Sequence, residues 1–295
     1  MPLFYRRLPR FEYVSPGTVE EAVAFLSGHG EDAKLLAGGT DLVPQLKGRE
    51  IKAHYVVDLK AIPGLDAVSS HGASVVTIGA LATISSIARS PVVNERFPLL
   101  VQAASVMASP QVRNRGTFVG NICSAVPSAD SAPGLLALEA RVRLKGPGGE
   151  RIVPIDRFFT GPRTTVVARD EVALAIEVPF PPAGSRGAYL KLSPRHSMDL
   201  AVVGVAVQAA CDHGVCTHVR IGLGAVAPTP VRAPLAESML EGKAITPQLI
   251  DEAARHSITQ CSPIDDHRAS QEYRCDMVYV MTRRALTRVL LEGGK

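Results

Sequence analysis

Apolar positions recur at helical spacing near the start of the chain. The segment SPGTVEEAVAFLSGHG carries them at Ala22, Val23 and Leu26, which places one apolar stripe along a helix. Thr18 stands where it can cap the first turn, with Glu21 as reciprocal partner three residues later. This pattern predicts a helix that begins after Thr18 and is ended by the glycines at positions 28 and 30.

Two short apolar runs flank a glycine turn and predict strands. The first is AKLLA at residues 33–37, and the second is HYVVDL at residues 54–59, rich in β-branched and aromatic side chains. Between them lie the turn GGTD and a short amphipathic piece. With the preceding helix, these runs predict a compact α/β unit that ends at about residue 55.

The middle of the chain shows the apolar spacing of strands in some segments and that of helices in others. VVTIGALATISSIA predicts a strand followed by a short helix, and FPLLVQAASVMAS predicts a second helix. Residues 109–140 are rich in Gly, Ser, Asn and Pro yet too apolar for a linker, and we expect an ordered loop there. ARVRLKGPGGERIVPI predicts a hairpin around residues 146–149, and DEVALAIEVPF predicts a strand that two prolines end.

The prolines at positions 181 and 182 indicate a domain boundary near residue 180. Beyond it, YLKLSPR, DLAVVGVAVQAAC and VCTHVRIGLGAV predict three strands, the last two joined by a turn at residues 212–214. Two helices are predicted from residue 247 to about 261 and from 271 to about 291. We therefore expect one domain at 1–180, with subdomains of about 1–55 and 56–180, and a smaller domain at 181–295.

Composition narrows the classes of partner. The 295 residues are 46% hydrophobic, and the net charge of +4 is not gathered into a basic stripe with aromatic side chains, so we expect no nucleic-acid binding. The longest apolar run, at residues 200–211, falls short of the roughly 20 residues that cross a bilayer, and no membrane span is expected. The N-terminal segment lacks the pattern of a secretion signal. Five irregularly spaced cysteines argue against a disulfide framework, so the expected compartment is the cytoplasm.

The turn GGTD that follows the first predicted strand has the features of an anion nest. Because Gly38 and Gly39 lack a Cβ, successive backbone N–H groups can point into one concavity there. Thr40 adds a hydroxyl donor, and Asp41 could accept from a sugar hydroxyl or cap the next helix. The alternative is a plain turn between strand and helix, because a glycine pair alone is weak evidence.

Other motifs carry less chemistry. GLGAVA at residues 222–227 has dinucleotide-binding spacing, but prolines follow where a helix should open, which argues against a Rossmann site. The segment CDHGVCTH contains two cysteines and two histidines within eight residues, a composition found in zinc sites. On a hairpin, however, Cys211 and Cys216 are more simply explained as small core residues. In RHSMD, His196 and Asp199 are expected at a surface or partner contact rather than in a catalytic pair. We expect neither a catalytic residue nor a metal ligand on this chain.

Four segments together carry a family resemblance: KLLAGGTDL, TIGALATI, SPQVRNRGTFVGNICSAVPSADSAPGLLALEA and DEVALAIEVP. In this order and at these distances they resemble the FAD-binding subunit of the molybdenum hydroxylases, the xanthine dehydrogenase and carbon monoxide dehydrogenase family. The resemblance implies an α+β fold with a two-subdomain FAD-binding unit of the PCMH/VAO type, not a Rossmann fold. A smaller, CO dehydrogenase flavoprotein-like C-terminal domain of antiparallel sheet plus helices should follow.

The resemblance also implies an FAD site. The first glycine turn would bind the pyrophosphate, and the loop RGTFVGN would approach it from the other side. Asp130 would accept from a cofactor hydroxyl, Lys191 would lie near the flavin and stabilise its reduced form, and Leu200 would cover the isoalloxazine, where some relatives have tyrosine. The residues implied to bind FAD are Lys34, Leu35, Leu36, Ala37, Gly38, Gly39, Thr40, Asp41, Met107, Ala108, Gly116, Thr117, Gly120, Asn121, Asp130, Lys191 and Leu200.

The resemblance implies a role and partners. The segment after the GN loop lacks the cysteine-rich insertion of the 4-hydroxybenzoyl-CoA reductase branch, so FAD alone is expected on this chain. Molybdopterin would lie on a large partner subunit and two [2Fe–2S] clusters on a small one, in a heterotrimer or a dimer of heterotrimers. The chain would collect electrons as FADH2 and pass them to NAD+, a quinone or another carrier. A self-standing flavin reductase and a non-redox nucleotide-binding module are the alternatives.

Overall fold

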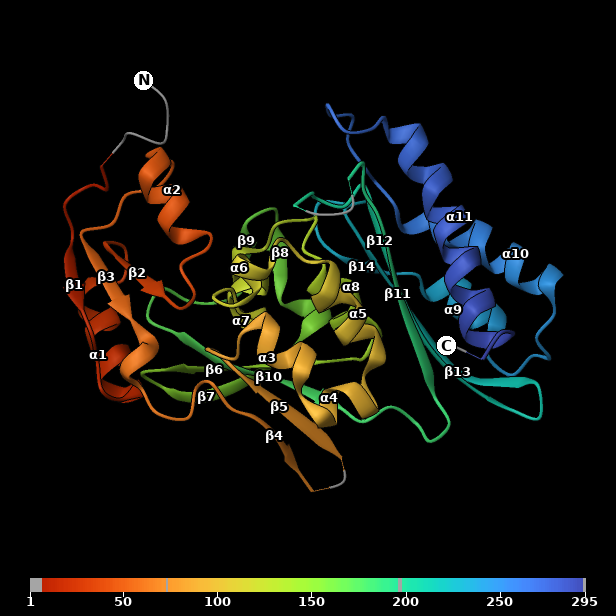
Figure 1. The fold of residues 1–295 in the computed structure, drawn as a ribbon, viewed down its shortest axis with the longest axis horizontal. Coiled ribbons are helices and arrows are strands. Elements are labelled where there is room, and N and C mark those ends of the chain that lie inside the picture. Colours follow the sequence, from red (N-terminus) through yellow and green to blue (C-terminus); the bar gives the residue numbers. More distant parts are fainter. Residues whose placement is uncertain (1–6, 73, 196–197, 294–295) are drawn as a thin grey trace.

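The computed structural model describes residues 7–72, 74–195 and 198–293. Three regions lie side by side in Figure 1: an N-terminal sheet with its helices, a central sheet with short helices, and a C-terminal sheet covered by longer helices. Parallel and antiparallel sheets occur together with helices, as expected for an α+β fold. No helix within the described residues is long and apolar enough to cross a membrane.

The N-terminal sheet is parallel, in the order β1-β3-β2. Its strands are β1 (Glu12–Val14), β2 (Ala33–Leu36) and β3 (Tyr55–Asp58). Parallel neighbours need crossover connections, and the helices α1 (Val19–His29) and α2 (Leu42–Gly48) lie in them. The strand β1 was not predicted.

The helix α1 agrees with its prediction except for one contact at its start and the position of its end. The Thr18 hydroxyl accepts from the Glu21 N–H at 3.1 Å, but the Glu21 carboxylate reaches the N–H of Gly17 rather than that of Thr18. The helix also runs through Gly28 instead of ending there. His29 stacks on Phe25 with ring centroids 4.4 Å apart, which favours one more helical residue before the chain leaves the helix at Gly30.

The central sheet is antiparallel, in the order β4-β5-β10-β6-β7. Its strands are β4 (Val68–His71), β5 (Val75–Gly79), β6 (Arg141–Gly146), β7 (Gly149–Pro154) and β10 (Val172–Pro179), and a small pair, β8 (Phe159–Gly161) and β9 (Thr164–Thr165), lies beside it. The first helices of this region are α3 (Ile84–Arg89), α4 (Pro91–Arg96) and α5 (Pro98–Val106). The described residues also form the 3₁₀ turns η2 (Leu59–Ala61), η3 (Ile155–Arg157) and η4 (Ser257–Gln260).

The segment 109–140, predicted as a loop, is mostly helical. It forms α6 (Pro110–Arg113), α7 (Phe118–Ser124) and α8 (Ser131–Ala137). The loop prediction was wrong because its polar residues act at helix ends: Ser109 and Thr117 cap α6 and α7. Apolar residues of the helices that follow, such as Phe118 in α7 and Leu135 in α8, are fully buried in the core.

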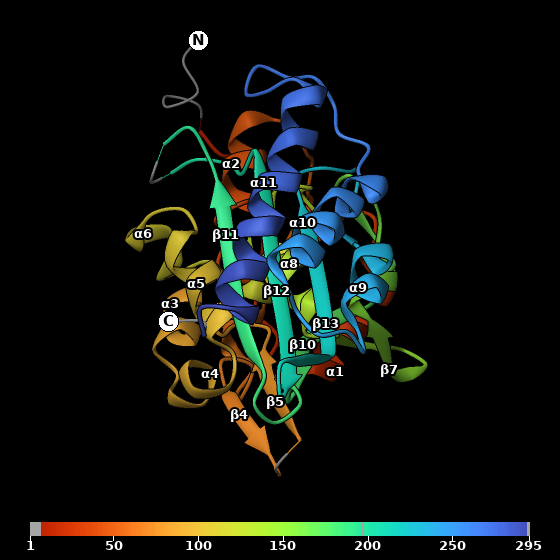
Figure 2. The same cartoon turned by 90° about the vertical axis from the view of Figure 1, so that its right-hand side faces the viewer.

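The C-terminal sheet is antiparallel, in the order β11-β12-β13-β14. Its strands are β11 (Arg186–Leu192), β12 (Val203–Asp212), β13 (Val215–Gly224) and β14 (Val231–Arg232). Figure 2 shows the helices α10 (Pro247–His256) and α11 (Gln271–Leu290) in front of the sheet, with α9 (Pro234–Leu240) beside them. The predicted strand at residues 199–211 begins later, at Val203, and neither β14 nor α9 was predicted because both are short.

Strand alternation divides the C-terminal sheet between two cores. Val205 and Val207 pack with the C-terminal helices, whereas Ala206 and Tyr189 belong to the core of the central region. Side chains two residues apart on a strand share a face. Lys191 therefore stands on the same face of β11 as Tyr189, toward the central region.

Candidate functional site

Two glycine-containing segments meet closely between the N-terminal and central regions. A Cβ at Gly38 would lie 1.9 Å from the carbonyl oxygen of Arg115, and one at Gly116 would lie 3.2 Å from the Thr40 hydroxyl oxygen. Gly39 adopts φ +74°, a left-handed conformation that favours glycine. The two glycines of the first turn thus serve different needs: Gly38 admits the neighbouring backbone, and Gly39 allows the chain to turn.

The first turn also offers free donors. Within the described parts of the chain, the backbone N–H groups of Gly38, Gly39, Thr40 and Asp41 find no protein acceptor, in the turn or beyond it. These residues are partly or largely exposed, so the donors are open to a ligand. Four successive N–H groups around a left-handed glycine fit the oxygens of a phosphate. The donor set therefore fits the pyrophosphate of FAD.

The side chains near this turn are linked across the chain. The Ser124 hydroxyl donates to Asp41 Oδ2 at 2.7 Å, and the Ser131 hydroxyl donates to Asn121 Oδ1 at 2.6 Å. Asp41 occupies the N-cap position of α2 but makes no side-chain capping bond, so the capping alternative is not realised. Its second carboxylate oxygen is left for another donor.

Thr117 and Gly120 occupy the first turn of α7. The Thr117 hydroxyl accepts from the N–H of Gly120 at 2.9 Å, and its own O–H can still donate. A Cβ at Gly120 would meet this same hydroxyl oxygen at 2.9 Å. Glycine at position 120 therefore leaves room for the capping hydroxyl of Thr117, and it places no side chain beside that hydroxyl.

A buried ionic cluster lies at the start of α8. Lys191 Nζ is 2.8 Å from Asp130 Oδ2, and the Tyr189 hydroxyl donates to Asp130 Oδ1 at 2.7 Å. Lys191 also donates to the carbonyl oxygens of Asp199 at 2.8 Å and Val106 at 3.4 Å. The three donors of the ammonium group thus meet three acceptors on the protein.

Burial and charge act in opposite directions on this cluster. Burial raises the pKa of Asp130, while the charge of Lys191 and the hydrogen bonds from Lys191 and Tyr189 lower it, with burial prevailing. Burial and the neighbouring carboxylate also raise the pKa of Tyr189 well above its usual value, so its hydroxyl stays protonated. The carboxylate depends on both partners for its stability.

Met107, Ala108 and Leu200 lie next to this cluster in the chain. Met107 is the C-cap residue that follows α5, and its carbonyl accepts a hydrogen bond from Arg113 at 2.8 Å. The next residue, Ala108, adopts φ +43°. Leu200 follows Asp199, whose carbonyl Lys191 holds, and is 43% exposed. An exposed leucine at this point is available to cover a flat ligand.

The structure therefore connects most of the residues implied by the resemblance. Close contacts and hydrogen bonds join the turn at Gly38 and Thr40 to Gly116, Asp41 to α7, Asn121 to α8, and Asp130 to Lys191. Lys34, Leu35 and Leu36 lie on β2, the edge strand that leads through Ala37 into the turn. Within the described residues, no side-chain hydrogen bond or ion pair joins these three to the second loop.

Sequence reasoning missed several residues of this region. Tyr189 was not singled out, although its spacing of two from Lys191 on a predicted strand indicates a shared face. Arg115 contributes its backbone carbonyl, and Ser124 and Ser131 contribute hydroxyls. Backbone approach and loop-to-loop hydrogen bonds leave no periodic signal in a sequence, so these three could not be found from spacing.

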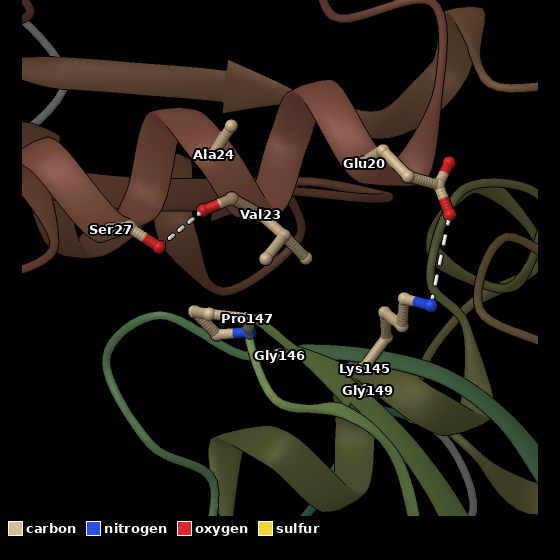
Figure 3. A pocket seen from close by; sticks show the side chains of 8 residues that line it. All are labelled: Glu20, Val23, Ala24, Ser27, Lys145, Gly146, Pro147 and Gly149. Carbon is tan, nitrogen blue, oxygen red and sulfur yellow. Dashed lines mark hydrogen bonds and ion pairs between the residues drawn. The ribbon is translucent and has the colours of Figure 1, made fainter.

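Two surface hollows lie elsewhere, along α1. The one in Figure 3 lies between α1 and the β6–β7 turn, where Glu20 and Lys145 form an ion pair of 3.8 Å. The other is lined by the end of α1 and residues 167–170. Neither hollow includes a residue of the two glycine segments. Each is lined by residues of α1 and of the central region that packs against it.

The remaining motifs gain no ligand-binding geometry. Residues 222–227 end β13 and enter a bend, without an opening helix. Among residues 7–72, 74–195 and 198–293, no three His, Cys, Asp or Glu side chains are placed to hold a metal ion. Cys216 is buried as predicted, but Cys211 is exposed, because the buried part of β12 ends at Ala210. The predicted contact of His196 lies outside the described residues, and Asp199 binds Arg195 and Leu200.

The chain is similar to known families and proteins over nearly its whole length. The family described as FAD binding domain in molybdopterin dehydrogenase matches residues 9–181, and the CO dehydrogenase flavoprotein C-terminal domain matches residues 188–289. The chain is 42% identical to the carbon monoxide dehydrogenase medium chain of Hydrogenophaga pseudoflava, with 94% of this chain and 96% of that one covered. It is 32% identical to the xanthine dehydrogenase FAD-binding subunit of Escherichia coli O157:H7, with 96% and 97% covered.

Solved structures show the same architecture. Carbon monoxide dehydrogenase from Hydrogenophaga pseudoflava, in a form that lacks the Mo-pyranopterin moiety of its cofactor, matches with a TM-score of 0.93 at 42% identity, covering 96% of this chain and 98% of that one. Quinoline 2-oxidoreductase from Pseudomonas putida 86 matches with a TM-score of 0.92 at 27% identity, covering 98% and 100%. The similarity thus extends through both sheet-bearing halves of the chain.

Proposed function

Because this chain belongs to the FAD-binding subunits of the molybdenum hydroxylases, the family of xanthine dehydrogenase and carbon monoxide dehydrogenase, we propose that it is an electron-transfer subunit. It takes electrons from [2Fe–2S] clusters of a partner subunit and passes them to an external acceptor such as NAD+ or a quinone. The observation that carries this proposal is the exposed turn at residues 38–41 beside Gly116, whose four backbone N–H groups have no acceptor among the described residues. FAD supplies the ability to store two electrons as FADH2 and release them.

The turn binds the pyrophosphate in this proposal. Gly38 to Asp41 provide backbone donors, and Asp41 has a carboxylate oxygen free to accept from a ribose hydroxyl. Lys34, Leu35, Leu36 and Ala37 line the approach along the free edge of β2. Gly116, Thr117, Gly120 and Asn121 face the pyrophosphate and ribityl chain from the second loop.

The flavin end lies toward the C-terminal domain. Met107 and Ala108 end the α5 segment there, and exposed Leu200 covers the isoalloxazine and excludes water from it. Lys191 acts through its charge and through its hold on Asp199, because its three donors already meet protein acceptors. Asp130 is held by Tyr189 and Lys191 and keeps lone pairs with which it can accept from a cofactor hydroxyl.

The proposal includes partners and organisation. A large subunit carries the molybdenum cofactor and oxidises the substrate, and a small subunit carries two [2Fe–2S] clusters, in a heterotrimer or a dimer of heterotrimers in the cytoplasm. Residues 1–180 form the FAD-binding domain, with subdomains of about 1–55 and 56–180, and residues 181–295 form the C-terminal domain. The relatives described as medium chain and FAD-binding subunit support a multi-subunit complex.

Purification from the native host tests this assignment. The absorption spectrum is expected to show flavin bands with iron–sulfur absorbance, and a denaturing gel is expected to show two further polypeptides. Flavin on a single chain would contradict the electron-transfer role and favour a self-standing reductase. A colourless protein would contradict the FAD site itself.

The substitution Gly39→Val tests the turn. Valine is strained at φ +74°, and its Cβ would meet Leu36 at 3.0 Å, so the four donors lose their arrangement and flavin is lost on purification. Gly184→Val is a matched control, because Gly184 has φ +73° with nothing within 4 Å of a Cβ. Normal flavin content in a folded Gly39→Val protein would refute the pyrophosphate site.

A further inference from the structure

Two cysteines stand directly opposite one another at the end of the β12–β13 hairpin. The register pairs Cys211 with Cys216, one step beyond a bulge that follows the Ala210–His218 pair. Directly opposed residues in antiparallel strands have Cα atoms about 4.5–5.5 Å apart. Disulfides span Cα separations of about 4.4–6.8 Å, so the backbone already meets this requirement.

The two side chains lie on the same face of the sheet, because directly opposed residues of an antiparallel pair share a face. Cys216 is fully buried in the core beneath the C-terminal helices, with its Sγ 3.4 Å from the carbonyl oxygen of His218. Cys211 is exposed. Burial raises the pKa of Cys211, and the hydrogen bond with Cys216 partly lowers it. One thiol is therefore accessible to solutes, and the other stands shielded beside it.

Backbone hydrogen bonds fix the buried cysteine in place. The N–H of Cys216 donates to the carbonyl of Lys243 at 2.9 Å, and the N–H of Gly242 donates to the carbonyl of Cys216 at 2.7 Å. The turn between the cysteines holds His213 at φ +46° and Gly214 at φ +81°. The pair is thus positioned by the hairpin on one side and by residues 242–243 on the other.

We propose that Cys211 and Cys216 are a thiol-oxidation site that closes into a reversible intramolecular disulfide. With a peroxide as oxidant, the Cys211 sulfur attacks one oxygen, the O–O bond breaks, and a sulfenic acid and water form. The Cys216 sulfur then attacks the Cys211 sulfur, the S–O bond breaks, and a second water leaves with the thiol proton. Two thiols and one hydrogen peroxide give one disulfide and two waters.

Proximity drives this reaction, since neither thiol is acidic. Burial, with the neighbouring thiol, raises the pKa of Cys216 to about 12, so the resolving sulfur reacts because the strand register holds it opposite Cys211. A cross-strand disulfide at an exposed strand end is also accessible to reductants. The disulfide would link β12 to β13 covalently at the end of the hairpin that packs on residues 242–243.

A second cysteine pair provides an internal control. The charge of Cys275 contributes to the raised pKa of Cys261, so the two are near each other. They lie on different elements, however, one after η4 and one in α11, and Cys261 Sγ contacts the carbonyl oxygen of Ser257 at 3.7 Å. No strand register aligns this pair for closure.

The test uses the full chain as purified, exposed to hydrogen peroxide, then denatured and alkylated for peptide mapping. Cys211 and Cys216 are expected to lose alkylation together, in one cross-linked peptide two hydrogens lighter, and to regain it after dithiothreitol. Cys211→Ser removes the cross-link and leaves Cys216 alkylatable, and because Cys211 is exposed this variant should fold. Cys275→Ser should leave the cross-link unchanged.

Three results would overturn the proposal. In the first, both cysteines stay alkylatable at a peroxide dose that fully oxidises glutathione. In the second, Cys211 is found linked to another chain or to a different cysteine. In the third, Cys216 still loses alkylation after peroxide treatment of Cys211→Ser.

Discussion

The ammonium group of Lys191 lies 2.8 Å from the carboxylate of Asp130, and only 7% and 10% of the two side chains are exposed. Lys191 belongs to the C-terminal sheet, and Asp130 precedes a helix of the central region. This ion pair therefore joins the two halves of the chain at the side where Leu200 is exposed.

Replacing Lys191 with methionine should destabilise the protein by about 3–5 kcal/mol, because it leaves a buried carboxylate without its counter-charge. Urea unfolding monitored by circular dichroism measures this loss. Lys243→Met, at an exposed lysine, should change the unfolding free energy little. Equal effects of the two substitutions would show that the buried pair is not important for stability.

Gly38→Ala should impair flavin retention and cost about 1–3 kcal/mol, since the new Cβ would overlap the Arg115 carbonyl oxygen at 1.9 Å. The flavin-to-protein ratio and the melting temperature measure both effects. Gly28→Ala is the control, because Gly28 lies within α1 with open space around a Cβ, and alanine there should be stabilising. A Gly38→Ala protein with normal stability would contradict the close approach of the two segments.

Asp266 should confer a pH-dependent part of the stability. Burial opposes its ionisation, but hydrogen bonds from the N–H groups of Arg268 and Ala269 and the ion pair with Arg274 lower its pKa to about 2. An unfolded aspartate titrates near pH 4, so the folded state binds fewer protons between these values. The stabilisation is complete above about pH 4 and is lost as the pH falls toward 2.

Comparing Asp266→Asn with the wild type across pH tests this expectation. The difference in melting temperature should be constant near neutral pH and should narrow as the pH falls through 4. At neutral pH the variant should be clearly destabilised, because Arg274 is 3% exposed and loses its counter-charge. Asp66→Asn, at an exposed residue, serves as the control. A gap that does not change with pH would refute the assignment.

Two glutamates that pair with Arg232 should differ in importance. Glu237 is buried and also accepts from the N–H of Ile221 at 2.8 Å, whereas Glu139 is 48% exposed on its side chain. Glu237→Gln should therefore cost about 3 kcal/mol, and Glu139→Gln less than about 1 kcal/mol. Thermal unfolding of both variants decides this, and a reversed order would contradict the role of burial.

The sequence by itself determined the longer elements and the family. The long apolar run at residues 200–211 and the length of the last helix are strong local signals, and the ordered motifs from KLLAGGTDL to DEVALAIEVP led to an FAD-binding subunit of the molybdenum hydroxylases, which the family match confirms. The short elements β1, β4, β8, β9, β14, α4 and α9 were missed, and three short helices were mistaken for a loop. Short elements depend on packing, because a few residues do not complete a period.

Only the tertiary structure decided how the candidate site is arranged. Gly38 needs to be glycine because Arg115, 77 positions later, brings a carbonyl oxygen to it, and Asp130 is held by Tyr189 and Lys191 from another sheet. Likewise, strand register placed Cys211 opposite Cys216. Local periodicity reports which face of an element is buried, but it carries no information on which distant backbone or side chain that face will meet.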